Sequence, residues 1–171
     1  MSAYRFFPVG VFGAGPRGYP ELSPEVFYSR LLESMDEHPL YQAVTDAPFI
    51  IRLLIMASFR EARLVRVWRA QSGWQMISKQ SKWWNGPSAL SDERPRELDS
   101  REGTQVEDGF AGVGFWSLQS ADTLRYTDGW ECLLEAADSA RYHVVHRSNP
   151  EESAFLDFVR LLGRISQSSG A

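Results

Sequence analysis

The order of apolar and polar residues predicts a β-sheet that begins near the middle of the chain. Residues 48–59 form an apolar run that carries one charged residue, Arg52, and such a run is typical of a buried strand. Residues 63–69 alternate between apolar and polar side chains, and residues 74–82 alternate again after a short turn. The two alternating segments therefore predict a β-hairpin.

A second hairpin is predicted over residues 130–147. Its strands, residues 130–136 and 141–147, are separated by a four-residue turn, and pairing around that turn places Ala136 opposite Arg141. Alternate residues then share a face of the sheet. One face holds Cys132, Leu134, His143 and Val145. The other face holds Glu131, Leu133, Glu135, Tyr142, Val144 and His146.

Two helices are predicted where a capping residue precedes a proline. The first begins after Ser23, with Pro24 in its first turn, and ends before Pro39. The second begins at residues 149–150, and residues 166–171 after it are expected to be frayed. The first helix carries an apolar face of Val26, Phe27, Leu31, Leu32 and Met35. The second carries one of Phe155, Leu156, Phe158, Val159, Leu162 and Ile165.

These elements predict a single α+β domain over residues 1–171, with a mainly antiparallel sheet of about five strands flanked by two or three helices. Residues 85–109 interrupt the pattern, because charges of both signs alternate and apolar residues nearly vanish. They predict a long polar loop with at most one short helix. In residues 109–119 the glycines predict a close approach of the backbone, and Phe115 and Trp116 are expected to enter the core.

Composition narrows the classes of function. The chain has 171 residues, a formal net charge of −4, six tryptophans and one cysteine. The acidic balance argues against a general nucleic-acid binder. The lone Cys132 excludes an internal disulfide and predicts a reducing compartment, so a cytoplasmic location is expected. No run is long and apolar enough to predict a membrane span.

The motifs of common cofactors and metals are absent or out of context. Residues 13–18 match the glycine pattern of dinucleotide-binding loops, but Pro20 and Pro24 prevent a helix from starting directly after it. His143 and His146 point to opposite faces of a strand, so they do not bind one metal ion together. We therefore expect no cofactor and no metal.

An enzymatic role, hydrolase-like, remains one hypothesis. In the predicted register Glu131 lies opposite His146 and Glu135 lies opposite Tyr142, and a carboxylate beside an imidazole is a plausible acid–base pair. The same pair is also an ordinary cross-strand contact. If the protein is an enzyme, the candidate catalytic residues are His146, Glu131, His143 and Glu135; otherwise there are none.

Binding of single-stranded nucleic acid is a further alternative. The first hairpin interleaves basic and aromatic side chains, as stacking platforms for single strands do. These residues are Arg66, Trp68, Lys79, Lys82 and Trp84. The aliphatic parts of arginine and lysine side chains also pack over rings in any half-exposed sheet. The negative net charge of the chain argues against nucleic acid as a partner.

The leading hypothesis is a bacterial protein-interaction module that binds another protein. A small acidic chain without catalytic motifs but with a long polar segment fits an immunity protein that neutralises a toxin effector encoded nearby. The candidate partner-binding residues are Trp83, Trp84, Asp92, Glu93, Glu97, Asp99 and Glu102. The oligomeric state does not follow from the sequence.

The last third of the chain resembles uncharacterised bacterial proteins of comparable length. These share an acidic-Gly turn, a Trp-containing strand ending in Glu, a Tyr-His-Val-Val-x-Arg strand, and a Pro before a helix. The matching positions are Asp128, Gly129, Glu135, Tyr142, His143, Val144, Val145, Arg147 and Pro150. Residues 114–118 are similar to their Phe-Trp element. The chain departs in placing Trp130 directly after the glycine and in lacking a Trp after Arg147. The resemblance implies no activity.

Overall fold

The computed structural model describes residues 6–13, 24–41, 49–58, 60–81, 95–121 and 129–167. In this part of the chain six strands form one antiparallel sheet in the order β4-β3-β2-β1-β5-β6, with three α-helices, so the fold is α+β as predicted. The strands are β1 (Phe49–Ala57), β2 (Ala62–Ala70), β3 (Gly73–Ser81), β4 (Arg96–Glu97), β5 (Trp130–Asp138) and β6 (Tyr142–Ser148). The helices are α1 (Pro24–Ser34), α2 (Ser100–Val113) and α3 (Ala154–Gln167).

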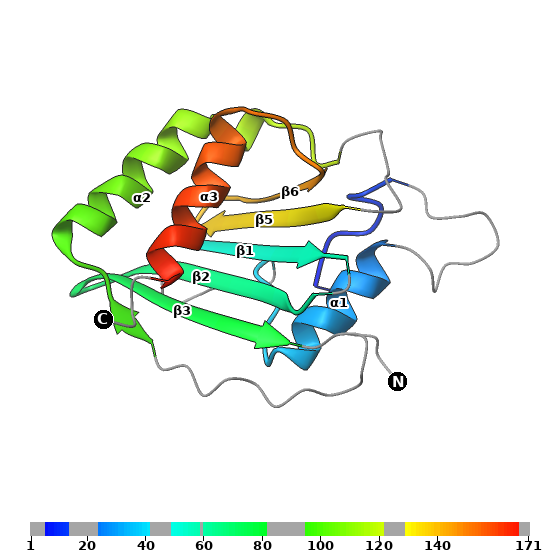
Figure 1. The fold of residues 1–171 in the computed structure, drawn as a ribbon, viewed down its shortest axis with the longest axis horizontal. Coiled ribbons are helices and arrows are strands. Elements are labelled where there is room, and N and C mark those ends of the chain that lie inside the picture. The colour runs from blue at the N-terminus through cyan, green and yellow to red at the C-terminus, as the bar shows by residue number, and fades with distance from the viewer. Residues whose placement is uncertain are drawn as a thin grey trace.

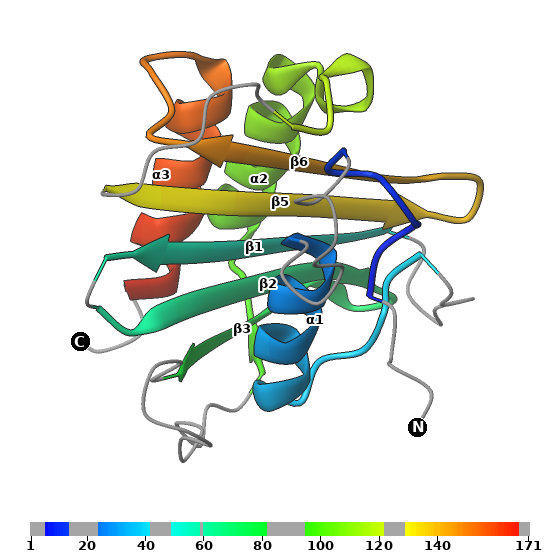
Figure 2. The ribbon, with the colours of Figure 1, turned by 90° about the vertical axis from the view of Figure 1, so that its right-hand side faces the viewer.

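The helices cover both faces of the sheet (Figures 1 and 2). α2 and α3 lie against one face, and α1 lies against the other. Side chains of α2 and α3 join one apolar cluster with alternate residues of the strands, such as Ile51 and Leu53 of β1. Side chains of α1 join a second cluster with the intervening residues, such as Leu54 and Met56. The strand alternation thus separates two cores, one on each side of the sheet.

The turn of the β5–β6 hairpin is tighter than predicted. The strands continue to Asp138, whose backbone N–H donates to the carbonyl oxygen of Arg141 at 2.9 Å. Asp138 Oδ1 accepts the backbone N–H groups of Ala140 and Arg141, both at 2.9 Å, which stabilises the turn. Ala136 consequently lies opposite His143, not opposite Arg141. The predicted register was wrong because this side-chain capping of the turn was not recognised.

The error in register is two residues, so every side chain stays on its predicted face. Glu131 lies opposite Ser148, and His146 lies opposite Leu133. Glu131 and His146 thereby become diagonal neighbours on one face, a separation that long side chains span. The predicted division of the hairpin into two faces is confirmed.

Residues 85–109, predicted to form a long polar loop, contain β4 and most of α2 in their described part, residues 95–109. The helix begins with a capping box: Asp99 Oδ1 accepts the backbone N–H of Glu102 at 2.8 Å, and Glu102 Oε2 accepts the N–H of Asp99 at 3.1 Å. The prediction allowed one short helix, but α2 is longer than that and the described part is not mainly a loop, because the polar residues form the outer face of the helix. Its buried residues Val106, Phe110 and Val113 straddle the boundary of the polar segment.

Two glycines of α2 permit close contacts, and one of them, Gly109, belongs to the segment for which such contacts were predicted. A β-carbon at Gly109 would lie 2.8 Å from Cδ2 of Phe158 in α3. A β-carbon at Gly103 would lie 2.8 Å from Cδ1 of Trp74 in β3. Phe115, just after the helix, is buried in the same core, whereas Trp116 is only partly buried against it. Glycine therefore sets how closely α2 packs against α3 and the sheet.

α3 begins later and ends later than predicted. Its first turn is capped by Ser153, whose Oγ accepts the backbone N–H of Leu156 at 3.3 Å. Asn149, the predicted cap, instead accepts the backbone N–H of Trp130 through Oδ1 at 2.9 Å, with a φ of 45°. Residues 166–167, expected to be frayed, are helical; residues 168–171 lie outside the described part. All six predicted apolar residues of this helix are buried.

The three described α-helices are at most 14 residues long, and none of them is long and apolar enough to cross a membrane.

Candidate functional site

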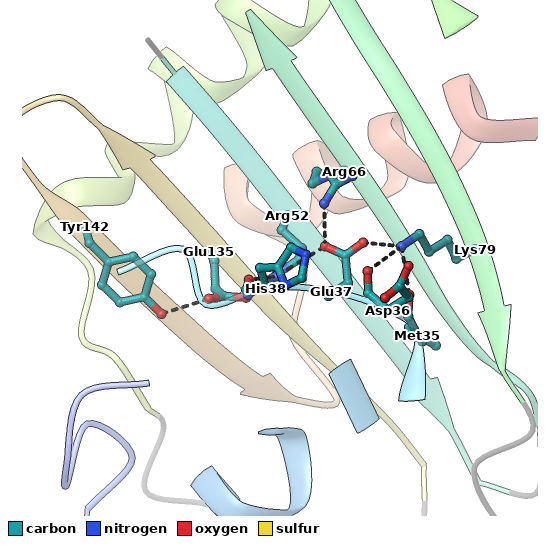
Figure 3. Close-up of polar contacts among 9 residues, drawn as sticks. All are labelled: Met35, Asp36, Glu37, His38, Arg52, Arg66, Lys79, Glu135 and Tyr142. Carbon is teal, nitrogen blue, oxygen red and sulfur yellow. Dashed lines mark hydrogen bonds and ion pairs between the residues drawn. The ribbon is translucent and has the colours of Figure 1, made fainter. Parts of the chain in front are cut away.

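Arg52 lies in the middle of β1, and its side chain is fully buried on the face that α1 covers. Its Nε donates to Oε2 of Glu135 at 2.7 Å on the neighbouring strand β5. Its Nη1 donates to Oε2 of Glu37 at 3.3 Å and to the backbone oxygen of His38 at 2.8 Å. Figure 3 shows that Arg52 joins the sheet to the segment that follows α1.

The carboxylate of Glu37 is held by basic residues of three adjacent strands (Figure 3). Arg66 of β2 donates from Nη1 to Oε2 at 2.9 Å, beside the contact from Arg52 of β1. Lys79 of β3 places Nζ 2.6 Å from Oε1 as an ion pair without hydrogen-bond geometry. Arg52 and Arg66 lie directly opposite each other, where like charges repel. The buried carboxylate between them removes that repulsion.

The end of α1 positions Glu37. Asp36 adopts a left-handed conformation with a φ of 54°. The backbone N–H of Glu37 donates to the oxygen of Leu32, and that of Asp36 donates to the oxygen of Glu33, both at 3.0 Å. This is the Schellman arrangement that ends many helices. It turns the chain towards the sheet, so α1 ends earlier than the predicted boundary before Pro39.

Lys79 completes the end of this helix. Its Nζ donates to the backbone oxygens of Met35 at 2.7 Å and Asp36 at 3.2 Å. The last carbonyls of a helix lack partners within the helix and carry partial negative charge, which a lysine neutralises. Lys79 is buried by these contacts, and it is therefore part of the junction between α1 and the sheet.

The cluster holds three basic side chains, Arg52, Arg66 and Lys79, against two carboxylates, Glu37 and Glu135. One positive charge is in excess. Nη2 of Arg52 has no hydrogen-bond partner among the described residues, although the guanidinium lies 5.7 Å from the centre of the Phe6 ring. A ring face at this distance offsets part of the missing hydrogen bond.

The carboxylates control the protonation of their neighbours. Burial by itself would lower the pKa of Arg52, but the charges of Glu135 and Glu37 outweigh it and raise the pKa above its usual value. Burial and the charge of Glu135 raise the pKa of Tyr142 far above its usual value, so this phenol stays protonated. Tyr142 donates its hydroxyl to Oε1 of Glu135 at 2.8 Å.

A second polar cluster lies where α1 meets the β5–β6 hairpin. Oε2 of Glu131 accepts the hydroxyl of Tyr28 at 2.6 Å and lies 2.8 Å from Nε2 of His146. The Glu131 side chain is 39% exposed, whereas the His146 side chain is 11% exposed. The ring of His146 packs against Tyr28 and Phe12. The cluster thus pairs a reachable carboxylate with an imidazole held between aromatic rings.

The four candidate catalytic residues are divided between separate places. Glu131 and His146 meet, as the hypothesis required. Glu135 belongs to the Arg52 cluster instead. His143 lies on the opposite face, where its Nε2 is 2.8 Å from the backbone oxygen of Leu118 and its ring packs against Phe115. The prediction that the two histidines lie on opposite faces of the strand is confirmed, and only His146 lies beside Glu131. Cys132 is fully buried, so the structure gives no access to its thiol.

The candidate partner-binding residues have mixed roles. Asp99 and Glu102 cap α2, and Glu102 also forms two hydrogen bonds with the guanidinium of Arg96, at 2.9 and 3.0 Å. That guanidinium holds the pKa of Glu102 below its usual value. Glu97 is exposed on the edge strand β4. Four others lie outside the described residues: Trp83, Trp84, Asp92 and Glu93.

The candidate nucleic-acid platform is not an open surface in its described part. Arg66 and Trp68 share a face as predicted, and the guanidinium of Arg66 stacks on the Trp68 ring at 5.4 Å. Arg66 is bound to Glu37, and Lys79 is buried under the end of α1. Lys82 and Trp84 lie outside the described residues. The available charge of this face is therefore smaller than its sequence indicates.

Three residues of these clusters did not emerge from the sequence reasoning: Arg52, Glu37 and Tyr28. Arg52 had a visible signal, since it is the one charged residue in an apolar run and a buried charge requires partners. Glu37 and Tyr28 had none, because a glutamate near a helix end and a tyrosine in a helix are common. Their roles depend on contacts 15 and 103 residues away in sequence.

No group of three or more residues able to bind a metal ion is found among the described residues. No protein-family model matches the chain, and a search of curated proteins finds none with significant sequence similarity to it. Any statement about function thus depends on the geometry described above.

Proposed function

We propose that the protein is a bacterial, cytoplasmic interaction module that binds another protein, as an immunity protein binds the toxin effector that it neutralises. The observation that supports this proposal is the internal pairing of the buried ionisable groups. Arg52, Glu135, Glu37 and Lys79 are bound to one another or to backbone oxygens. Groups used in this way stabilise the fold and are not available as acids or bases.

The edge of the sheet at β4 is the proposed contact surface. Glu97 and Asp99 are exposed there, beside the first turn of α2. Exposed carboxylates at a sheet edge discourage pairing with unrelated strands and favour a basic partner. The net charge of −4 strengthens attraction to such a partner at a distance.

Co-expression with the product of a neighbouring gene tests the proposal. The expected result is a complex that copurifies, together with restored growth of cells in which that product is toxic. If the products of both flanking genes fail to copurify with the protein and growth is not restored in either case, the result counts against an immunity role.

Charge reversal tests the contact surface. Glu97→Lys should weaken the complex by at least about tenfold, because placing like charges in contact costs several kcal/mol. Glu33→Lys is the matched control, since Glu33 is also exposed but lies on α1, on the other face of the sheet. An equal loss of affinity in both variants would mean that the partner does not bind specifically at β4.

A small hydrolase-like enzyme is the second candidate, and the contact between exposed Glu131 and His146 is what favours it. Glu131 would be the residue that reaches a substrate, with Tyr28 and His146 orienting it. Chromogenic esters and phosphate esters are suitable probes. Turnover by the wild type that disappears in Glu131→Gln would support this role, and no turnover of either substrate class would oppose it.

A further inference from the structure

The layer formed by α1 and residues 35–41 is joined to the sheet by apolar packing and by polar side chains. Between described residues, every hydrogen bond from this layer to the sheet uses a side chain: those of Tyr28, Arg52, Arg66 and Lys79. No backbone hydrogen bond between described residues links the layer to the sheet. The strands of the sheet, in contrast, are linked by continuous backbone ladders. Within the described residues, separation of the layer thus breaks no backbone ladder.

The charges at this junction lower the cost of separation. When the layer is closed, Glu37, Arg52 and Lys79 are withdrawn from water, which is unfavourable for each of them. Their mutual attraction offsets that penalty. When the layer opens, the charges become hydrated again. The free energy of opening is therefore smaller than the number of broken ion pairs indicates. The apolar side chains of the same junction, such as Leu32 of α1 and Leu64 of β2, have no such compensation and oppose opening.

We propose that residues 24–41 form a lid that opens from the sheet as one unit, and that Glu37 is the latch that keeps it closed. Glu37 is the only described residue of this layer whose side chain contacts basic residues of β1, β2 and β3 together. Opening exposes that face of the sheet with its three basic side chains, Arg52, Arg66 and Lys79. The lid is distinct from the proposed contact surface at β4, and it does not depend on that proposal.

Hydrogen exchange measured by mass spectrometry tests the lid in the wild type. Amides of α1 should exchange at least about tenfold faster than amides in the middle of β1 and β5, and their exchange should depend weakly on denaturant, as local opening does. Equal exchange rates with equal denaturant dependence in α1, β1 and β5 would show that α1 opens only when the whole protein unfolds, and would overturn the proposal.

Glu37→Gln tests the latch, because it keeps the shape of the side chain and removes its charge. Exchange in α1 should accelerate by at least about tenfold, since hydrogen bonds to a charged group are among the stronger ones, whereas exchange in β1, β5, α2 and α3 should not change. Glu102→Gln is the matched control, because Glu102 is also paired with an arginine but lies on the other face. It should affect only the first turn of α2.

Equal acceleration throughout the chain in Glu37→Gln, or none in α1, would overturn the role of Glu37. If Glu37→Gln does not fold, Arg66→Gln replaces it, because Arg66 is partly exposed and only one of the three contacts is removed. A smaller acceleration confined to α1 would then support the latch. Acceleration that reaches β5 would refute it.

Discussion

The two faces of the sheet are held by different physical means. Under α2 and α3, twenty buried apolar side chains of the described residues form one cluster. Under α1 the described apolar cluster has thirteen members, and beside it lie Arg52, Glu37, Glu135 and Lys79, which are buried and charged. Among the described residues, fully buried charged side chains thus lie only on the α1 face, beside its apolar cluster.

The difference shows where the fold is adaptable. Apolar packing gives its stability without requiring a particular direction, and close contacts at Gly109 make it rigid. A buried ion cluster contributes less net stability than apolar packing of the same volume, but it tolerates only one arrangement of its members. We infer that packing on the α2–α3 face contributes most of the free energy of unfolding. On the α1 face, the ion cluster holds the layer of residues 24–41 in one position, from which the layer can open.

The largest effect is expected from Arg52→Ala. The substitution leaves Glu135 buried without the guanidinium that pairs with it and removes one of the three cations around Glu37. Breaking a buried ion pair in this way costs about 3–5 kcal/mol. Chemical denaturation measures the loss. Replacing all three residues together, as Arg52→Met, Glu37→Leu and Glu135→Leu, should restore only part of the stability, because Lys79 and Tyr142 then lose their buried carboxylate partners. If Arg52→Ala alone costs less than about 1 kcal/mol, the cluster is not buried in solution.

Gly109→Ala tests the rigidity of the other face. The new methyl group would overlap Phe158, and overpacking of a core costs about 1–3 kcal/mol. Gly112→Ala is the control, since a β-carbon there meets no atom within 4 Å and alanine favours a helix. The control should be neutral or stabilising in thermal denaturation. An equal loss in both variants would contradict the close packing of α2 on α3.

Tyr142→Phe tests the polar face at high pH. Removing the hydroxyl leaves Oε1 of Glu135 without its donor, which costs about 1–3 kcal/mol at neutral pH. The raised pKa of Tyr142 means that the folded state keeps a proton that the unfolded state loses above about pH 10. Stability of the wild type therefore falls as pH rises beyond that value.

The variant lacks this ionisable group, so its stability should fall less steeply over the same range. Comparing denaturation of both proteins between neutral pH and pH 11 isolates the contribution. Parallel curves would mean that Tyr142 is solvated and that the hydrogen bond to Glu135 is weak.

The smallest effect is a gain, from Asp36→Gly. Asp36 occupies a left-handed conformation at the end of α1, where glycine has no steric penalty. We expect a gain of up to about 1 kcal/mol in unfolding free energy and slower hydrogen exchange in α1. Faster exchange in the variant would mean that the aspartate side chain itself holds the turn.

Much of the fold follows from local patterns. The run around Arg52 predicts β1, and the alternation after it predicts the β2–β3 hairpin, as the structure confirms. The six apolar residues of α3 are all buried as predicted. For residues 85–109 the sequence allowed only a short helix and not the 14 residues of α2, because the polar outer face of the helix dominates this segment. The β5–β6 register was missed because Asp138 shortens the turn through its side chain.

The candidate sites also divide into features that the sequence predicts and features that only the tertiary structure creates. Glu131 and His146 share a face in any register shifted by an even number of residues, so their common face depended only on strand periodicity, whereas their contact also required a register within two residues of the predicted one. Glu37, by contrast, meets Arg52, Arg66 and Lys79 only because α1 ends in a left-handed turn above three paired strands. Periodicity is a property of neighbouring residues, and the chain carries it before it folds. The position of one carboxylate among three distant cations exists only after the sheet and helix have packed, because it depends on the geometry of both.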